Sequence, residues 1–300
     1  MSNKEYLNKL DPAVISGLKN LEIKARSIVE GFMVGMHKSP YHGFSAEFSE
    51  HRPYQQGDSI KNIDWKVYAK SEKYFVRQFE EETNLICNII LDSSKSMDYK
   101  NDAPVTKWEY SVLLAASLAY ILTNQHDAAG LIQFSDTIEN YLSPKSNRIH
   151  LRNILLTLEK TAPSKKTETG KCLTLVAEKI KKRGLTIIIS DFFDEPSSII
   201  ATLNYLRSQQ NEVILFQVLD PVELSFSFGK DAVFVDMETY EELSAQPYQI
   251  QQAYRSAVKE FIEKIKTECR KKNFDYNLIL TSDSFDKALL AFFKKRARMY

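Results

Sequence analysis

The 300-residue sequence is poor in cysteine, and its three cysteines lie far apart along the chain. An odd, sparse set of cysteines cannot form a disulfide framework, and no C-x-x-C pair indicates a zinc site. Glycine and proline number only nine each, and no stretch resembles a flexible linker, an internal repeat or a low-complexity segment. Because sparse cysteines fit a reducing compartment, we expect a cytoplasmic protein.

Long hydrophobic runs and an excess of one charge are also missing. The longest apolar run extends from Val112 to Leu122, interrupted only by Ser117 and Tyr120, and is too short to span a bilayer as a helix. The first residues contain no apolar signal core. The 40 basic and 39 acidic side chains give a formal net charge of +1, which argues against a histone-like or an acidic disordered protein. We therefore exclude a secreted mini-protein and a membrane span, but the composition leaves the function open.

Apolar runs that end in polar side chains alternate with helical patterns from residue 85 onward. The runs 85–92, 185–191 and 212–220 predict buried strands, because a parallel strand covered on both faces shows no polar alternation. Further strands are expected at 128–136 and 274–282, and helices at about 106–123, 147–160, 170–182, 197–209 and 248–272, with a last helix ending near 296. This alternation predicts an α/β fold with an open, mostly parallel sheet flanked by helices.

The first 81 residues have a different texture. Apolar side chains at helical spacing over 11–36, with Asp11 and Pro12 as a start signal, predict a helix. Residues 40–84 combine glycine, aromatic and charged residues with short β-like pieces. We therefore divide the chain into an N-terminal helix and small β-rich segment (1–81) and an α/β domain (82–300).

The strand 85–91 leads directly into a D-x-S-x-S sequence formed by Asp92, Ser94 and Ser96. A curling loop can direct these alternating side chains the same way, and one carboxylate with two hydroxyls suits Mg²⁺ or Mn²⁺. Thr167 and Asp191 are expected on the same rim, because ligands bind at the carboxyl ends of parallel strands. The simpler interpretation is that these side chains only cap backbone groups.

This pattern resembles the metal-ion-dependent adhesion site of von Willebrand factor A domains, over roughly residues 82–296. The resemblance implies a fold of that type and a bound Mg²⁺, Mn²⁺ or Ca²⁺. It implies that one coordination position stays open for an acidic side chain of a partner. The implied metal ligands are Asp92, Ser94, Ser96, Thr167 and Asp191, with Thr169 as a second candidate for the threonine.

A second pattern lies in the segment 43–69, with the spacing G-x-x-x-E-F-x-x-x-R-x-Y-x-x-G-D-x-x-x-x-I-D-W-x-x-x-A. It strongly resembles the bacterial domain of unknown function 58 family, whose members join this segment to a von Willebrand factor A-like domain. Its residues form either an ion-paired structural loop or a partner-binding surface: Glu47, Arg52, Tyr54, Gly57, Asp58, Asp64 and Trp65. Members are often encoded beside MoxR-type AAA+ ATPases, so the resemblance implies such an ATPase or its client as partner.

These patterns together predict a non-enzymatic protein-interaction module that acts with a MoxR-type ATPase in protein assembly or maturation. One alternative is a metal-dependent hydrolase at the same rim, for which Asp98, Asp194 and Glu195 are the nearby acidic candidates. Complete phosphate-binding and nucleophile-elbow motifs are missing.

The other alternative is nucleic-acid binding through the basic helix ends 179–183 and 294–296. We expect these ends to be solvated, since cations there complement the helix dipole, and we expect no nucleic acid as partner. Trp65 and Trp108 are expected in the core, and the five histidines are expected to be ordinary surface or core residues.

Overall fold

A six-stranded sheet with the order β10-β7-β6-β3-β4-β5 forms the centre of the computed structural model. The structure describes residues 10–18, 20–37, 51–53, 65, 68–69, 73–77, 85–101, 103–163, 169–228, 232–235, 242–245 and 247–299. The strands are β3 (Ile86–Asp92), β4 (Ala128–Phe134), β5 (Ile138–Lys145), β6 (Leu185–Ser190), β7 (Glu212–Leu219) and β10 (Asp275–Leu280). All neighbouring pairs are parallel except β4 and β5. The predicted open, mostly parallel sheet is confirmed.

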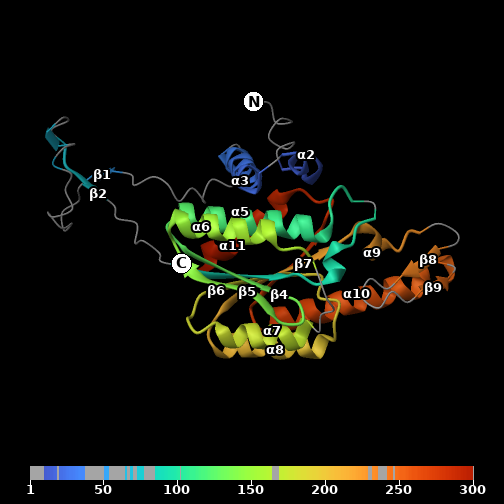
Figure 1. Ribbon diagram of the computed structural model, residues 1–300. Coiled ribbons are helices and arrows are strands. Elements are labelled where there is room, and N and C mark those ends of the chain that lie inside the picture. The colour runs from blue at the N-terminus through green and yellow to red at the C-terminus, as the bar shows by residue number, and fades with distance from the viewer. Residues whose placement is uncertain are drawn as a thin grey trace.

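Helices cover both faces of this sheet (Figure 1). One face carries α5 (Lys107–Asn124), α6 (Arg148–Lys160) and α11 (Phe285–Met299), and the other carries α7 (Thr169–Lys179), α8 (Pro196–Ser208) and α10 (Pro247–Lys271). Two N-terminal helices, α2 (Pro12–Ser16) and α3 (Leu21–His37), lie outside α5. The stacked rings of Phe32 and Phe293, with centroids 5.4 Å apart, join α3 to α11.

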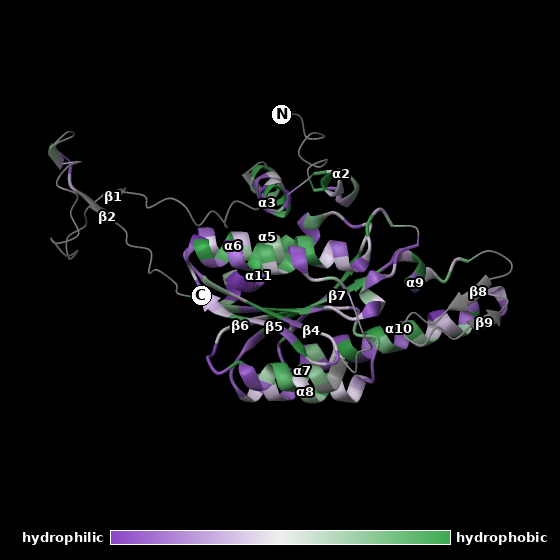
Figure 2. Ribbon diagram, in the orientation of Figure 1, coloured by the Kyte–Doolittle hydropathy of each residue, from purple (hydrophilic) through white to green (hydrophobic). Residues whose placement is uncertain are grey.

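The core explains why the apolar runs predicted strands correctly. In β3, Ile89 packs with the α5 layer and Ile90 packs with the α7 layer, and both are fully buried. Figure 2 shows hydrophobic residues concentrated on α5, the helix that crosses the middle strands. A strand covered on both faces has no solvent side on which polar residues would alternate.

Several elements differ from the sequence prediction. The single helix expected over 11–36 is two helices, although Asp11 does cap α2, accepting a 2.8 Å hydrogen bond from the Ala13 amide. β5 was not predicted, because it is an edge strand whose outer residues are exposed and whose sequence contains Pro144. Also unpredicted are the short helix α9 (Pro221–Ser225) and the antiparallel hairpin of β8 (Ala232–Val235) and β9 (Glu242–Ala245).

The three cysteines are free, and all are buried. This agrees with the prediction that they form no disulfide framework. None of the helices in the described part of the chain has the length and apolar character needed to cross a membrane.

The prediction of a solvated basic helix end holds for the exposed Lys294 but is wrong for Lys295 and Arg296. Lys295 is only 6% exposed, and its Nζ lies 2.7 Å from a carboxylate oxygen of Glu212 and 3.2 Å from one of Asp275. Arg296 pairs with the buried Asp127. These cations are drawn inward because α11 packs on the sheet beside acidic residues at the start of three strands. The other basic end, 179–183, has exposed lysines as predicted.

Gly184, directly before β6, marks a close approach of two strands. A Cβ at this position would lie 2.2 Å from the carbonyl oxygen of Ile86 in β3. Because the obstacle is backbone, Gly184→Ala should push the strands apart and lower the free energy of unfolding by about 1–3 kcal/mol. Urea denaturation measures this loss. Gly17→Ala is the control, since its Cβ would lie 3.6 Å from the Val14 carbonyl oxygen, an ordinary contact distance. Equal midpoints for the two variants would contradict the close approach.

Candidate functional site

The candidate site lies at the carboxyl edge of two adjacent parallel strands, β3 and β6. Asp92 is the last residue of β3, and Asp191 directly follows β6. Ser94 directly precedes the short 3-10 helix η2 (Lys95–Asp98), which contains Ser96, and the Ser94 side chain makes no capping hydrogen bond to it. The sheet thus brings four of the five predicted metal ligands to one edge. The fifth, Thr167, lies outside the described residues, and so does the orientation of the Thr169 side chain.

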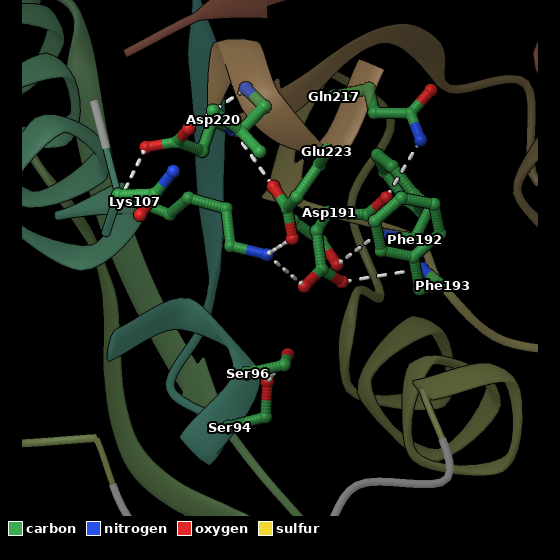
Figure 3. A network of polar contacts seen from close by, with 12 residues as sticks. Ser94, Ser96, Lys107, Asp191, Phe192, Phe193, Gln217, Asp220 and Glu223 are labelled. Atoms are coloured by element: carbon green, nitrogen blue, oxygen red, sulfur yellow. Dashed lines mark hydrogen bonds and ion pairs between the residues drawn. The ribbon is translucent and has the colours of Figure 1, made fainter. Parts of the chain in front are cut away.

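The oxygen atoms of this edge are held in place by hydrogen bonds. The Ser94 and Ser96 hydroxyl oxygens lie 3.0 Å apart (Figure 3). The Ser94 amide donates to Oδ1 of Asp92 at 2.9 Å, and the Ser190 hydroxyl donates to Oδ2 at 2.6 Å. Both oxygens of the buried Asp92 carboxylate are therefore oriented by the protein.

Lys107 is a site residue that the sequence analysis missed. Its side chain is 1% exposed, and its ammonium donates to Oδ2 of Asp191 at 2.8 Å and to Oε1 of Glu223 at 2.6 Å. Figure 3 shows the ammonium between these two carboxylates. A lysine in the first turn of a helix opposes the helix dipole. Its place at the start of the apolar helix α5 was the one signal that could have indicated an acidic partner.

Glu223 is anchored by the helix that contains it, α9, which begins directly after β7. Its Oε2 accepts a 2.8 Å hydrogen bond from the Asp220 amide, while the Asp220 side chain accepts one from the Val222 amide at 2.9 Å. One Glu223 oxygen thus caps a helix and the other contacts Lys107. The Lys107 ammonium thereby connects the loops after β6 and β7 to the start of α5.

Burial and neighbouring charges shift the pKa values of Asp92, Asp191 and Glu223 in different directions. Burial, and then the nearby Asp191, raise the pKa of Asp92 to about 6. Burial alone would also raise the pKa of Asp191, but the Lys107 ammonium holds it below its usual range. Burial raises the pKa of Glu223 even though Lys107 opposes it. With all groups ionised, three carboxylates and one ammonium leave a net charge of −2.

The donor set fits a hard cation that keeps several waters. No group of three or more histidine, cysteine or acidic side chains that could hold a metal occurs in the described part of the chain. Binding would therefore depend on the Ser94 and Ser96 hydroxyls beside Asp92. Oxygen ligands of this kind suit Mg²⁺ or Mn²⁺, and Mg²⁺ commonly uses only one or two carboxylates.

Two of the three acidic candidates for a hydrolase are engaged in other contacts, and the third, Glu195, is exposed at the start of α8. Asp98 forms an ion pair with Lys95 at 2.7 Å and is 41% exposed on its side chain. The Asp194 carboxylate accepts a hydrogen bond from the Glu195 amide at 2.6 Å. Neither contact orients a base toward the serine hydroxyls.

Most of the N-terminal motif lies outside the described residues, namely Glu47, Tyr54, Gly57, Asp58 and Asp64. The backbone of Arg52 lies in β1 (His51–Pro53), which pairs antiparallel with β2 (Phe75–Arg77). The prediction of a core position is wrong for Trp65, which is 55% exposed. Its ring packs edge-on against the ring of Tyr68, with the centroids 6.0 Å apart. The prediction is confirmed for Trp108, which is 8% exposed.

The parallel sheet with one antiparallel edge strand, and the oxygen-lined edge after its central strand β3, define an α/β protein of the von Willebrand factor A type. The chain belongs to the family described as protein of unknown function DUF58, whose sequence profile matches residues 50–264. Similar relatives include Uncharacterized protein Mb1516 of Mycobacterium bovis and Uncharacterized protein Rv1480 of Mycobacterium tuberculosis. Each is 25% identical over 238 residues, which cover 76% of this chain and 72% of the relative.

Two solved structures are similar to this chain at low sequence identity. The conserved hypothetical protein BatB from Bacteroides thetaiotaomicron is 16% identical, with a TM-score of 0.49 over 71% of this chain and 97% of its own. The SpRpn10 VWA domain is 14% identical, with a TM-score of 0.40 over 69% of this chain and 94% of its own.

Proposed function

We propose that this protein is a cytoplasmic, non-enzymatic interaction module that binds a divalent cation at the carboxyl edge of β3 and β6. The observation that supports it is the 3.0 Å approach of the Ser94 and Ser96 hydroxyls beside the buried carboxylates of Asp92 and Asp191. Such an approach collects hard oxygen donors at the sheet edge where ligands of open α/β folds bind. In this proposal, the cation and a partner's acidic side chain together form the contact.

Each residue has a separate part in this proposal. Ser94 and Ser96 contribute hydroxyl oxygens, and Asp92 contributes a carboxylate that Ser190 and the Ser94 amide hold in a fixed orientation. Asp191 acts through water, and Thr167 is proposed as a further ligand. When bound, the cation supplies a Lewis-acidic position that accepts a carboxylate oxygen.

The partner that we propose is a MoxR-type AAA+ ATPase, or a client of it, in protein assembly or maturation. Membership of the DUF58 family supports this choice, since the N-terminal motif resembles family members encoded beside such ATPases. The proposed cation site requires an exposed aspartate or glutamate on the partner, because a carboxylate is the hard anionic ligand that Mg²⁺ prefers.

Mn²⁺ binding followed by electron paramagnetic resonance tests the site. We expect the wild-type protein to bind Mn²⁺ and Ser96→Ala to bind it at least about tenfold more weakly, since disturbing a metal's ligand shell commonly costs 10–100-fold. Ser93→Ala is the matched control. The Ser93 hydroxyl donates to the carbonyl of Phe134 at 2.8 Å and to Glu139 at 3.1 Å, away from the site.

Recovery of the ATPase with the tagged protein then tests the interaction. We expect recovery in Mg²⁺ and loss of recovery with EDTA or with Asp92→Ala. Equal recovery in all conditions would overturn metal-dependent binding, and equal Mn²⁺ affinity of Ser96→Ala and Ser93→Ala would overturn the ligand assignment.

A further inference from the structure

We propose that Lys107 is an internal counter-cation that keeps Asp191 out of direct contact with the divalent ion and so prepares the loaded site for an acidic ligand. This inference rests on the proposed cation site. In this arrangement Lys107 sets both the affinity for metal and the preference for a carboxylate. Lys107 is 1% exposed, so it is a positioning residue that acts through Asp191 and does not contact the partner.

Hydrogen bonds hold both carboxylate oxygens of Asp191. Its Oδ2 accepts the Lys107 ammonium at 2.8 Å, and its Oδ1 accepts the Phe193 amide at 3.2 Å. Both oxygens are therefore engaged, and the charged contact is the stronger one, because ion-assisted hydrogen bonds are about twice as strong as neutral ones. Asp191 would have to give up this contact in order to bind the metal directly.

The contact between Lys107 and Glu223 makes that exchange unfavourable. The Lys107 ammonium is also held by Glu223 at 2.6 Å, and Glu223 is fixed by its own hydrogen bond to the Asp220 amide. The rings of Tyr99 and Phe193 flank the ammonium with centroids 5.7 and 5.6 Å away. Because carboxylates and aromatic rings surround the buried ammonium, its position in the site is fixed.

The charge balance gives the consequence for ligands. The cluster of Asp92, Asp191, Glu223 and Lys107 carries a net charge of −2 with all groups ionised, so a divalent cation brings it to neutrality. An incoming carboxylate then meets no net repulsion. Without the ammonium, the loaded cluster would stay negative and would repel an acidic ligand. Lys107 therefore weakens metal binding and strengthens carboxylate binding.

The decisive variant pairs Lys107→Gln with Glu223→Gln. It removes one charge of each sign, so the net charge of the cluster is unchanged while Asp191 loses its ion pair. We expect Mn²⁺ affinity to rise about tenfold, the lower end of the effect of outer-shell partners. We also expect luminescence lifetimes of bound Tb³⁺ in H₂O and D₂O to report about one coordinated water fewer, because the Asp191 carboxylate replaces it.

The single variant Lys107→Gln separates the two roles. It should bind Mn²⁺ more tightly than the wild type, yet its metal-loaded form should bind acetate, the probe for a partner's carboxylate, more weakly. Lys107→Arg keeps the charge and should resemble the wild type. Circular dichroism verifies folding, and the double variant carries the test if the single variant does not fold.

The outcomes distinguish this inference from the proposed function. If the wild type binds Mn²⁺ and the double variant shows the same affinity and water count, the role of Lys107 is overturned and the cation site stands. Tighter acetate binding by loaded Lys107→Gln would also overturn it. If neither the wild type nor Ser93→Ala binds Mn²⁺, the cation site and this inference both fail.

Discussion

Lys107→Met is expected to lower the free energy of unfolding by about 3–5 kcal/mol, the usual cost of removing one partner from a buried ion pair. The substitution leaves the carboxylates of Asp191 and Glu223, whose side chains are 3% and 14% exposed, without their shared cation. Methionine fills a similar volume, so the loss reports charge and hydrogen bonding more than packing. Urea denaturation at pH 7.5, without added metal, measures the change.

Lys95→Met is the matched control for this prediction. Lys95 lies on the same edge and forms an ion pair with Asp98 at 2.7 Å, but the two side chains are 33% and 41% exposed. A solvent-exposed pair of this kind contributes at most about 1 kcal/mol. Losses of similar size in the two variants would contradict the view that burial makes the Lys107 contacts costly to break.

Asp92→Asn is expected to act in the opposite direction and to stabilise the metal-free protein at pH 7.5 by up to about 3 kcal/mol. Folding raises the pKa of this carboxyl from its ordinary 3.8 to about 6, first through burial and then through Asp191. A rise of this size corresponds to about 3 kcal/mol against the ionised form. Asparagine keeps the shape and an acceptor for the Ser94 amide, but it carries no charge.

The sign of the pH dependence follows from proton linkage. Between about pH 4 and pH 6 the folded Asp92 holds its proton while the unfolded one has lost it, so the folded state binds more protons. The free energy of unfolding that Asp92 contributes therefore falls as the pH rises through this window. The difference between Asp92→Asn and wild type should be near zero at pH 4 and largest above pH 6.

Asp98→Asn serves as the control for this pH profile, because its carboxylate is 41% exposed. A pH profile of Asp92→Asn that matches the profile of Asp98→Asn would contradict the raised pKa of Asp92. Stabilisation together with lost Mn²⁺ binding would indicate that the protein keeps a costly carboxylate at this edge for the cation.

The sequence predicted the parts of the fold that depend on local pattern. β3, β6 and β7 were found because a strand buried on both faces is largely apolar and shows no regular polar alternation. The edge strand β5 was missed because its pattern changes along the strand, from half-buried residues to an alternation that ends at Lys145. Its register with β4 also shifts at two positions, so no regular period marks it.

The candidate site was predictable only to the extent that it is local. Asp92, Ser94 and Ser96 lie within five residues, so their convergence follows from one loop. Lys107 contacts Asp191 and Glu223 across 84 and 116 residues of sequence, and only the folded sheet brings them together. Separation along the sequence also explains the wrong prediction for Lys295, because its acidic partners, Glu212 and Asp275, belong to two strands that only the fold brings beside α11.

The position of β5 has a consequence for how the protein behaves at high concentration. An outermost strand presents unpaired backbone groups on which a second molecule could add a strand. Pro144, near the end of β5, has no backbone N–H to offer, and the exposed Lys145 follows it. The ring of Pro144 occupies the space that a side chain on Gly130 would need, with its Cγ 2.8 Å from that Cβ position. The absence of a side chain at Gly130 thus leaves space for the Pro144 ring. The proline and the exposed lysine after it disfavour the addition of a strand from a second molecule at this edge.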